Sequence, residues 1–230
     1  MLFSTTNILS TLALLTSVTS AAPTRRQTYS TPPKSTSNHF TLVANVTSGD
    51  LAINHFVLES YHTGAGTAYA VLAEDTTEAN PRIFYINGTA TDVRFGNSST
   101  ITDSGSGSDS FPESLTITPS DPASSFSGRS TVEINAGAGQ PYVGLTASPS
   151  QTTQLHGYQG ETFYACNTTL LYGPAIQLFY RGYSQETPAG CSDVALLPQC
   201  SEGGGAEDAS AATVSCYDDV AAIDWSIYSA

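Results

Sequence analysis

Short runs of alternating apolar and polar residues, separated by turn-forming residues, constrain the fold of this chain more than any other feature. In "FTLVANV", the side chains of Phe40, Leu42, Ala44 and Val46 fall on one face, as in a strand with one buried side. Similar runs cover 55–61, 67–74, 82–86, 89–95, 114–118, 130–135, 142–147, 161–167 and 175–182. Strong helix formers are scarce, whereas Ser, Thr, Gly, Tyr and Val abound. This pattern of about nine short strands predicts an all-β fold, an antiparallel β-sandwich or a partly closed barrel.

Two glycine-containing dipeptides predict where consecutive strands turn. Asn87-Gly88 lies between 82–86 and 89–95, and this dipeptide is typical of a type I′ hairpin. Gly173-Pro174 is expected to turn the chain between 161–167 and 175–182. Residues 96–110 are rich in Ser and Gly and are expected to form a loop.

The two ends of the chain differ in composition from the centre. Residues 1–20 contain the short apolar run "ILSTLALLTSV" followed by small residues, which predicts a cleaved export signal too short to span a bilayer. Residues 21–26 then form a short pro-segment that ends in the dibasic pair Arg25-Arg26, and residues 27–38 form a polar linker. We expect a β-sandwich domain over 39–200 and a flexible acidic extension over 201–230, whose last part could form a short helix. The chain is therefore predicted to be secreted.

The number of cysteines supports the prediction that the chain is exported. Cys166, Cys191, Cys200 and Cys216 are an even set, which in a secreted chain predicts two disulfides in one of three pairings. Sequential pairing closes the shortest loops and is favoured. A zinc site is the weaker alternative, because no C-x-x-C pair exists and the histidines lie far from the cysteines in sequence.

Four sequons are candidate N-glycosylation sites in an exported protein. They are centred on Asn45, Asn87, Asn97 and Asn167.

The net charge and the absence of catalytic motifs reduce the range of functions that fit this sequence. A net charge of −13 makes nucleic acid an unlikely partner. The sequence contains no G-x-S-x-G, no H-E-x-x-H and no phosphate-binding glycine motif, and it indicates no cofactor. A non-catalytic protein is favoured, and a polysaccharide hydrolase that uses two of the strand carboxylates Glu59, Glu133 and Glu161 is the alternative.

The segment "YHTGAG" sets an aromatic residue and a histidine beside two glycines. Because it lies between two predicted strands, Gly64 and Gly66 most simply provide the positive φ angles of a hairpin turn. If the surface around this turn binds a ligand, Tyr61, His62 and Tyr69 are the residues to test first.

"FVLESYHTGAG" together with "CSDVALLP" resembles an uncharacterised family of secreted fungal proteins, classed as a domain of unknown function. The spacing from "ETFYAC" through "AIQLFYRGY" to "GCSDVALLP" is similar as well, so the resemblance covers 39–198. It implies a secreted fungal β-protein with a Cys166–Cys191 bond, and it implies no activity. The expected function is that of a non-catalytic extracellular glycoprotein that binds carbohydrate, in the cell wall or on a host surface.

Overall fold

The computed structural model of the protein describes residues 31–76, 79–103, 111–119, 129–146, 150–158, 162–182, 184–203 and 211–228. The predicted export signal and pro-segment, the first part of the linker, the last part of the loop over 96–110 and Glu161 lie outside the described residues. Among the residues that are described, no helix is long and apolar enough to cross a bilayer.

Regular structure is almost entirely β, as the alternating runs predicted. The strands are β1 (Ser35–Ser37), β2 (His39–Ser48), β3 (Val57–Gly64), β4 (Thr67–Ala73), β5 (Phe84–Asn87), β6 (Ser99–Asp103), β7 (Pro112–Pro119), β8 (Arg129–Ala136), β9 (Gly144–Leu145), β10 (Leu155–His156), β11 (Thr162–Leu170), β12 (Gly173–Arg181), β13 (Cys191–Ser201), β14 (Ala211–Ala212) and β15 (Val214–Cys216). The helices are one short α-helix, α1 (Ala90–Phe95), and one turn of 3₁₀-helix, η1 (Trp225–Ile227).

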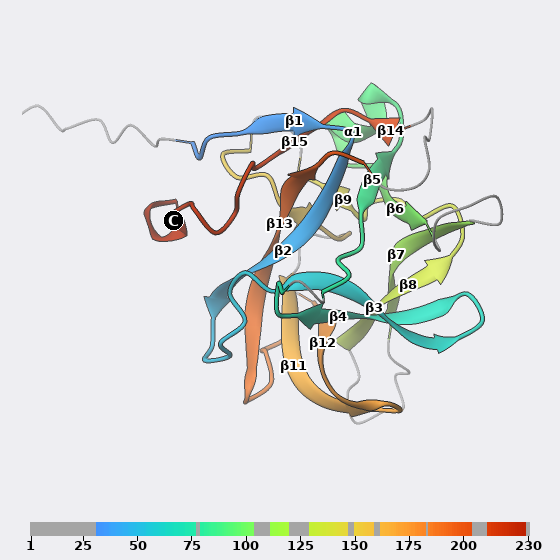
Figure 1. Ribbon diagram of the computed structural model, residues 1–230, viewed down its shortest axis with the longest axis vertical. Coiled ribbons are helices and arrows are strands. Elements are labelled where there is room, and N and C mark those ends of the chain that lie inside the picture. The colour runs from blue at the N-terminus through green and yellow to red at the C-terminus, as the bar shows by residue number, and fades with distance from the viewer. Residues whose placement is uncertain are drawn as a thin grey trace, which may run out of the picture.

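Eleven strands form one antiparallel sheet in the order β11-β13-β2-β3-β4-β12-β8-β7-β6-β5-β14. Additional pairs join β11 to β12, β2 to β5 and β4 to β8, so the sheet folds back on itself. Figure 1 shows β2 and β13 side by side at one side of the molecule, with β7 and β8 at the other. The all-β prediction is confirmed, and the arrangement is consistent with a sandwich rather than a clean barrel.

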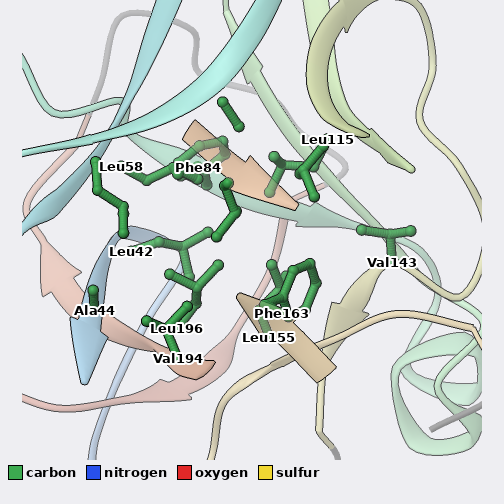
Figure 2. Close-up of a cluster of buried hydrophobic side chains, with 14 of the residues drawn as sticks. Leu42, Ala44, Leu58, Phe84, Leu115, Val143, Leu155, Phe163, Val194 and Leu196 are labelled. Carbon is green, nitrogen blue, oxygen red and sulfur yellow. The ribbon is translucent and has the colours of Figure 1, made fainter. Parts of the chain in front are cut away.

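The main core lies between these parts of the sheet. Phe40, Leu42 and Ala44 of β2 are fully buried there, which is the face that the alternation in "FTLVANV" predicted. Figure 2 shows Leu42 beside Leu196 of β13, with Phe84, Leu115 and Phe163 contributed by β5, β7 and β11. Val143, just before β9, and Leu155 of β10 also belong to this core.

The C-terminal segment is not a flexible extension over its described residues. Tyr217 and Val220 are fully buried, Trp225 is 8% exposed, and all three pack on Val43 and Leu197. The Trp225 indole N–H donates to the Val220 carbonyl oxygen at 2.9 Å. Residues 211–228 therefore form a second core on the other face of β2 and β13, because their apolar side chains cover a surface that would otherwise be exposed.

Part of the predicted linker is also ordered structure. β1 pairs with β15 through Ser35–Cys216, Thr36–Ser215 and Ser37–Val214. The Cys200–Cys216 disulfide holds β15 to β13, and the Cys166–Cys191 disulfide joins β11 to β13. The structure thus has the sequential pairing that the loop lengths favoured, and its described residues contain no free cysteine.

The hairpin predicted at Asn87-Gly88 is wrong, since 90–95 is helix α1. Thr89 caps this helix: its hydroxyl accepts from the Asp92 N–H at 3.2 Å, and the Asp92 carboxylate accepts from the Thr89 N–H at 2.9 Å. Gly96 ends the helix with φ 68°. This reciprocal capping outweighs the β-propensity of the segment.

Two strands and one turn also differ from the expectation. β6 lies in the predicted loop over 96–110, and β13, which the alternation did not single out, lies between β11 and β2. The β11–β12 hairpin turns at Leu171-Tyr172, so Gly173 and Pro174 already belong to β12.

Candidate functional site

An open cleft lies beside the end of α1 and has a volume of about 820 Å³. Three short segments line it: the end of α1 and its cap, the turn before β9, and the residues at and after β10. Their residues are Phe95, Gly96, Gln140, Pro141, Tyr142, His156, Gly157 and Tyr158. We call this surface the aromatic cleft.

Two exposed aromatic rings lie in this cleft. Phe95 is 73% exposed and Tyr142 is 52% exposed, so both leave apolar ring faces in contact with water. One exposed apolar side chain is ordinary, but two of them in one concave site with a third aromatic residue, Tyr158, indicate a binding surface.

The backbone holds Tyr142 in an unfavourable conformation. Its φ is 69°, in the left-handed region that residues with a Cβ rarely adopt and that costs about 1–2 kcal/mol. The turn that contains it is fixed by Gln140, whose side-chain oxygen accepts from the Ile117 N–H at 2.6 Å. Strain of this kind persists where the surrounding structure imposes it, and it is concentrated at functional sites.

Two glycines shape the floor of the cleft. A Cβ on Gly96 would lie 3.3 Å from the imidazole of His156, and Gly96 has the positive φ of the α1 cap. A Cβ on Gly157 would lie 2.5 Å from the ring of Tyr180. The Tyr180 hydroxyl in turn donates to the Tyr158 carbonyl oxygen at 2.8 Å, which fixes the segment that carries Tyr158.

The described lining of the cleft combines aromatic rings with few polar side chains. None of these described lining residues is Asp, Glu, Ser, Thr or Cys. Its imidazole is engaged locally, because His156 Nδ1 lies 3.2 Å from the Gly157 carbonyl oxygen. What the arrangement offers is flat aromatic surface with a few polar groups.

The residues predicted around "YHTGAG" lie outside this cleft, and the structure brings Tyr61 and Tyr69 together on one face while His62 lies apart from them. Tyr61 is opposite Tyr69 across β3 and β4, and its ring centroid is 5.6 Å from that of Tyr172. His62 is exposed and lines a separate pocket of about 230 Å³ that also contains the ion pair between Arg82 and Glu113.

The hairpin interpretation of this segment fits the structure. The turn is Ala65-Gly66, and Gly66 has φ 68°, whereas Gly64 is outside the left-handed region. A register irregularity between His62 and Gly64 accompanies the turn, as in hairpins with a bulge.

The strand carboxylates are engaged by protein donors. Glu59 accepts from the Asn80 N–H at 2.6 Å, and Glu133 accepts from Thr131 at 3.0 Å and Asn135 at 2.8 Å. β4 lies between them, since Glu59 is opposite Val71 and Glu133 is opposite Tyr69. Glu161, the third carboxylate, lies outside the described residues.

The sequons differ in their surroundings. Asn97 and Asn167 are exposed, whereas Asn45 in β2 and Asn87 in β5 are partly buried. Glycosylation at these four sites stays a prediction. The described residues contain no group of three or more His, Cys, Asp or Glu side chains that could hold a metal ion.

Sequence reasoning missed the aromatic cleft because its residues come from three distant segments. Tyr142 was assigned to a strand over 142–147, but only Gly144–Leu145 is strand. The signal that was available is "GQPY", in which an aromatic residue follows Gly and Pro in a turn instead of alternating with polar residues in a strand.

Comparison with known proteins places this chain in a family. The profile of a domain of unknown function, DUF7907, matches residues 37–200. The chain is also 34% identical, over 218 residues, to "Antigenic protein SchS34" of Stachybotrys chartarum, an alignment that covers 86% of this chain and 93% of that protein. No solved structure matches the chain significantly. Since the profile spans most of the sheet and the relative aligns over nearly its whole length, the chain belongs to the DUF7907 family.

Proposed function

We propose that this protein is a secreted, N-glycosylated, non-catalytic β-protein that binds polysaccharide of a cell wall or host surface through the aromatic cleft. The observation that carries the proposal is the pair of exposed rings, Phe95 and Tyr142, in one concave site, with Tyr142 in a strained conformation.

Sugar rings present C–H groups on one face and hydroxyl groups around their edge. The apolar face can pack on an aromatic ring, while the edge keeps its hydrogen bonds with water or with polar groups beside the ring. An open cleft with two exposed rings suits this mode of binding, because a polymer can lie across it without being enclosed.

Other observations support export and an extracellular role. The apolar leader is typical of an export signal, and two disulfides are expected where the environment is oxidising. The relative from Stachybotrys chartarum is named an antigenic protein, which is compatible with a protein that reaches the outside of the cell.

Pull-down with insoluble polysaccharides tests the proposal. Purified protein is incubated with chitin, cellulose and a β-glucan, and the bound fraction is measured as a function of polymer concentration. Tyr142→Ala and Phe95→Ala should each weaken binding at least tenfold, whereas Tyr142→Phe should retain it.

Tyr172→Ala is the matched control, because Tyr172 is an exposed tyrosine outside the cleft. Binding that depends on Tyr172 and not on Tyr142 would place the site near Tyr61 and Tyr69 instead. Failure to bind any of these three neutral polymers, together with failure to bind acidic polysaccharides, would contradict the proposed function. Release of reducing sugars in the same tubes would support the hydrolase alternative.

A further inference from the structure

A second cleft is also lined by α1, through Ala90, Val93 and Arg94, and has a volume of about 700 Å³. Lys34 lines it from the segment before β1 and Arg94 from the last turn of α1, with hydroxyl residues that include Thr146, Ser150 and Thr213. We call it the basic cleft.

The charge of the basic cleft is opposite to that of the whole molecule. The chain has 7 basic and 20 acidic residues, yet the described residues that line this cleft include two bases and no acid. Arg82 and Arg181 form ion pairs with Glu113 and Asp193, but among the described residues no ion pair involves Lys34 or Arg94. These two cations are therefore available to an anion.

The surroundings of Lys34 favour an incoming negative charge. Its ammonium donates to the Ser150 carbonyl oxygen at 3.2 Å, which holds it at the cleft. Partial burial removes water from the Lys34 ammonium and so lowers its pKa. A bound anion would offset this loss of hydration. The Ser150 hydroxyl donates to the Thr152 carbonyl oxygen at 2.6 Å, and this hydrogen bond holds the Ser150 side chain in place.

Arg94 connects the two clefts. Its guanidinium carbon lies 5.8 Å from the centroid of the Phe95 ring, within the range of a cation–π contact. Val93 and Arg94 line the basic cleft, and the next two residues, Phe95 and Gly96, line the aromatic cleft. A polymer whose sugar ring packs on Phe95 would therefore have a substituent or neighbouring ring within reach of Arg94.

We propose that the basic cleft is an anion subsite of the same binding surface, and that the natural ligand is an acidic saccharide whose carboxylate or sulfate group binds Lys34 and Arg94. This inference rests on the proposed function and names the class of saccharide. A nucleic acid fits less well, because two cations in a chain of net charge −13 supply too few phosphate contacts.

The test compares each acidic polymer with a neutral counterpart of the same backbone. Polygalacturonate and its fully methylated ester form the carboxylate arm, and dextran sulfate and dextran form the sulfate arm. Binding is measured by affinity electrophoresis at two salt concentrations. At least one acidic polymer should bind more tightly than its neutral counterpart, and the preference should weaken at high salt.

Variants separate the anion subsite from the aromatic cleft. Lys34→Gln should weaken binding of the preferred acidic polymer about tenfold, as expected for one charge-assisted hydrogen bond, and should leave the neutral counterpart unaffected. Arg94→Gln should act in the same direction and Arg94→Lys should retain most of the affinity. Tyr142→Ala should weaken binding of acidic and neutral polymers alike. Melting temperatures of all variants are measured first, and a loss of binding is attributed to the cleft only for variants that melt like the wild type.

Each outcome decides one proposal. Equal binding of acidic and neutral polymers, or an acidic polymer whose affinity is unchanged in both Lys34→Gln and Arg94→Gln, would overturn the anion subsite and leave the proposed function intact. No binding of any polymer, or binding that is unchanged in Tyr142→Ala, would overturn the proposed function itself.

Discussion

Tyr142 combines an exposed aromatic ring with a backbone conformation that disfavours it. For a residue kept for stability this combination is unexpected, because an exposed side chain contributes little packing to offset the strain. For a residue kept for binding it is reasonable, since the turn sets the direction of the ring. Stability and binding should therefore respond in different directions when this residue is replaced.

Tyr142→Asn tests this separation at a single position. Asparagine tolerates the left-handed region better than tyrosine, so the free energy of unfolding should stay unchanged or rise by up to about 1 kcal/mol, while polysaccharide binding is lost. Thermal melting and pull-down on the same samples measure the two effects. A clear fall in melting temperature would show that Tyr142 packs as a structural residue, which would weaken its assignment to the site.

At the scale of elements, α1 presents both Phe95 to the aromatic cleft and Arg94 to the basic cleft. This helix has six residues and no buried side chain, so it depends strongly on its caps. Thr89→Ala should destabilise it by about 1 kcal/mol and weaken binding at both clefts, whereas Thr89→Ser should keep the cap. Binding that is unaffected by Thr89→Ala would show that α1 needs no cap to present these residues.

Acid should loosen the same cap. Hydrogen bonds from the Thr89 side chain and backbone lower the pKa of Asp92 below its ordinary value of 3.8. The stabilisation that the ionised carboxylate provides is therefore present above about pH 4 and is lost as the pH falls through the lowered pKa. The difference in melting temperature between the wild type and Asp92→Asn, followed from pH 7 to pH 2, should be largest at neutral pH and vanish at the acidic end. A difference that is constant over this range would contradict the assignment.

The two disulfides connect different pairs of elements and should contribute similarly to stability. They span sequence separations of 25 and 16 residues, for which chain entropy gives about 3 kcal/mol each. The paired variants Cys166→Ala/Cys191→Ala and Cys200→Ala/Cys216→Ala should thus lower the melting temperature by comparable amounts. If 201–230 were a flexible extension, as the sequence predicted, Cys200→Ala/Cys216→Ala would lower the melting temperature only slightly.

The elements also show what the sequence could and could not predict. The strands β2, β4 and β8 were found because apolar residues at every second position mark the face that packs in the main core. Helix α1 was missed because its capping box of Thr89 and Asp92 coincides with an Asn-Gly dipeptide that is typical of hairpins. The aromatic cleft depends on the proximity of the three segments that carry Phe95, Tyr142 and Tyr158, and no local pattern reports proximity between segments so far apart.

At the scale of the whole molecule, the chain forms two cores on opposite faces of β2 and β13. Val43 and Leu197 face the second core, and the sequence predicted only the first, because an acidic, Gly-rich stretch separates the covering residues from the domain. The prediction of a flexible extension, which the composition of 201–210 suggested, was therefore wrong for the apolar residues that follow this stretch. The positions of Tyr217, Val220 and Trp225 (i, i+3 and i+8) are compatible with one face of a helix, so periodicity alone did not show that they cover β2 and β13.

Removal of 211–230 tests whether the second core is part of the fold. The loss of Trp225 alone should cost about 3–5 kcal/mol, against a total stability of about 5–15 kcal/mol for a domain. The truncated chain should therefore unfold at a much lower denaturant concentration and expose Val43 and Leu197, which favours aggregation. Since truncation also removes Cys216, both chains carry Cys200→Ala, and the full-length control also carries Cys216→Ala. The difference in unfolding midpoint between the two chains then reports the burial and strand pairing that truncation removes, and not the missing disulfide. Equal unfolding midpoints would mean that the sheet is stable without its C-terminal cover.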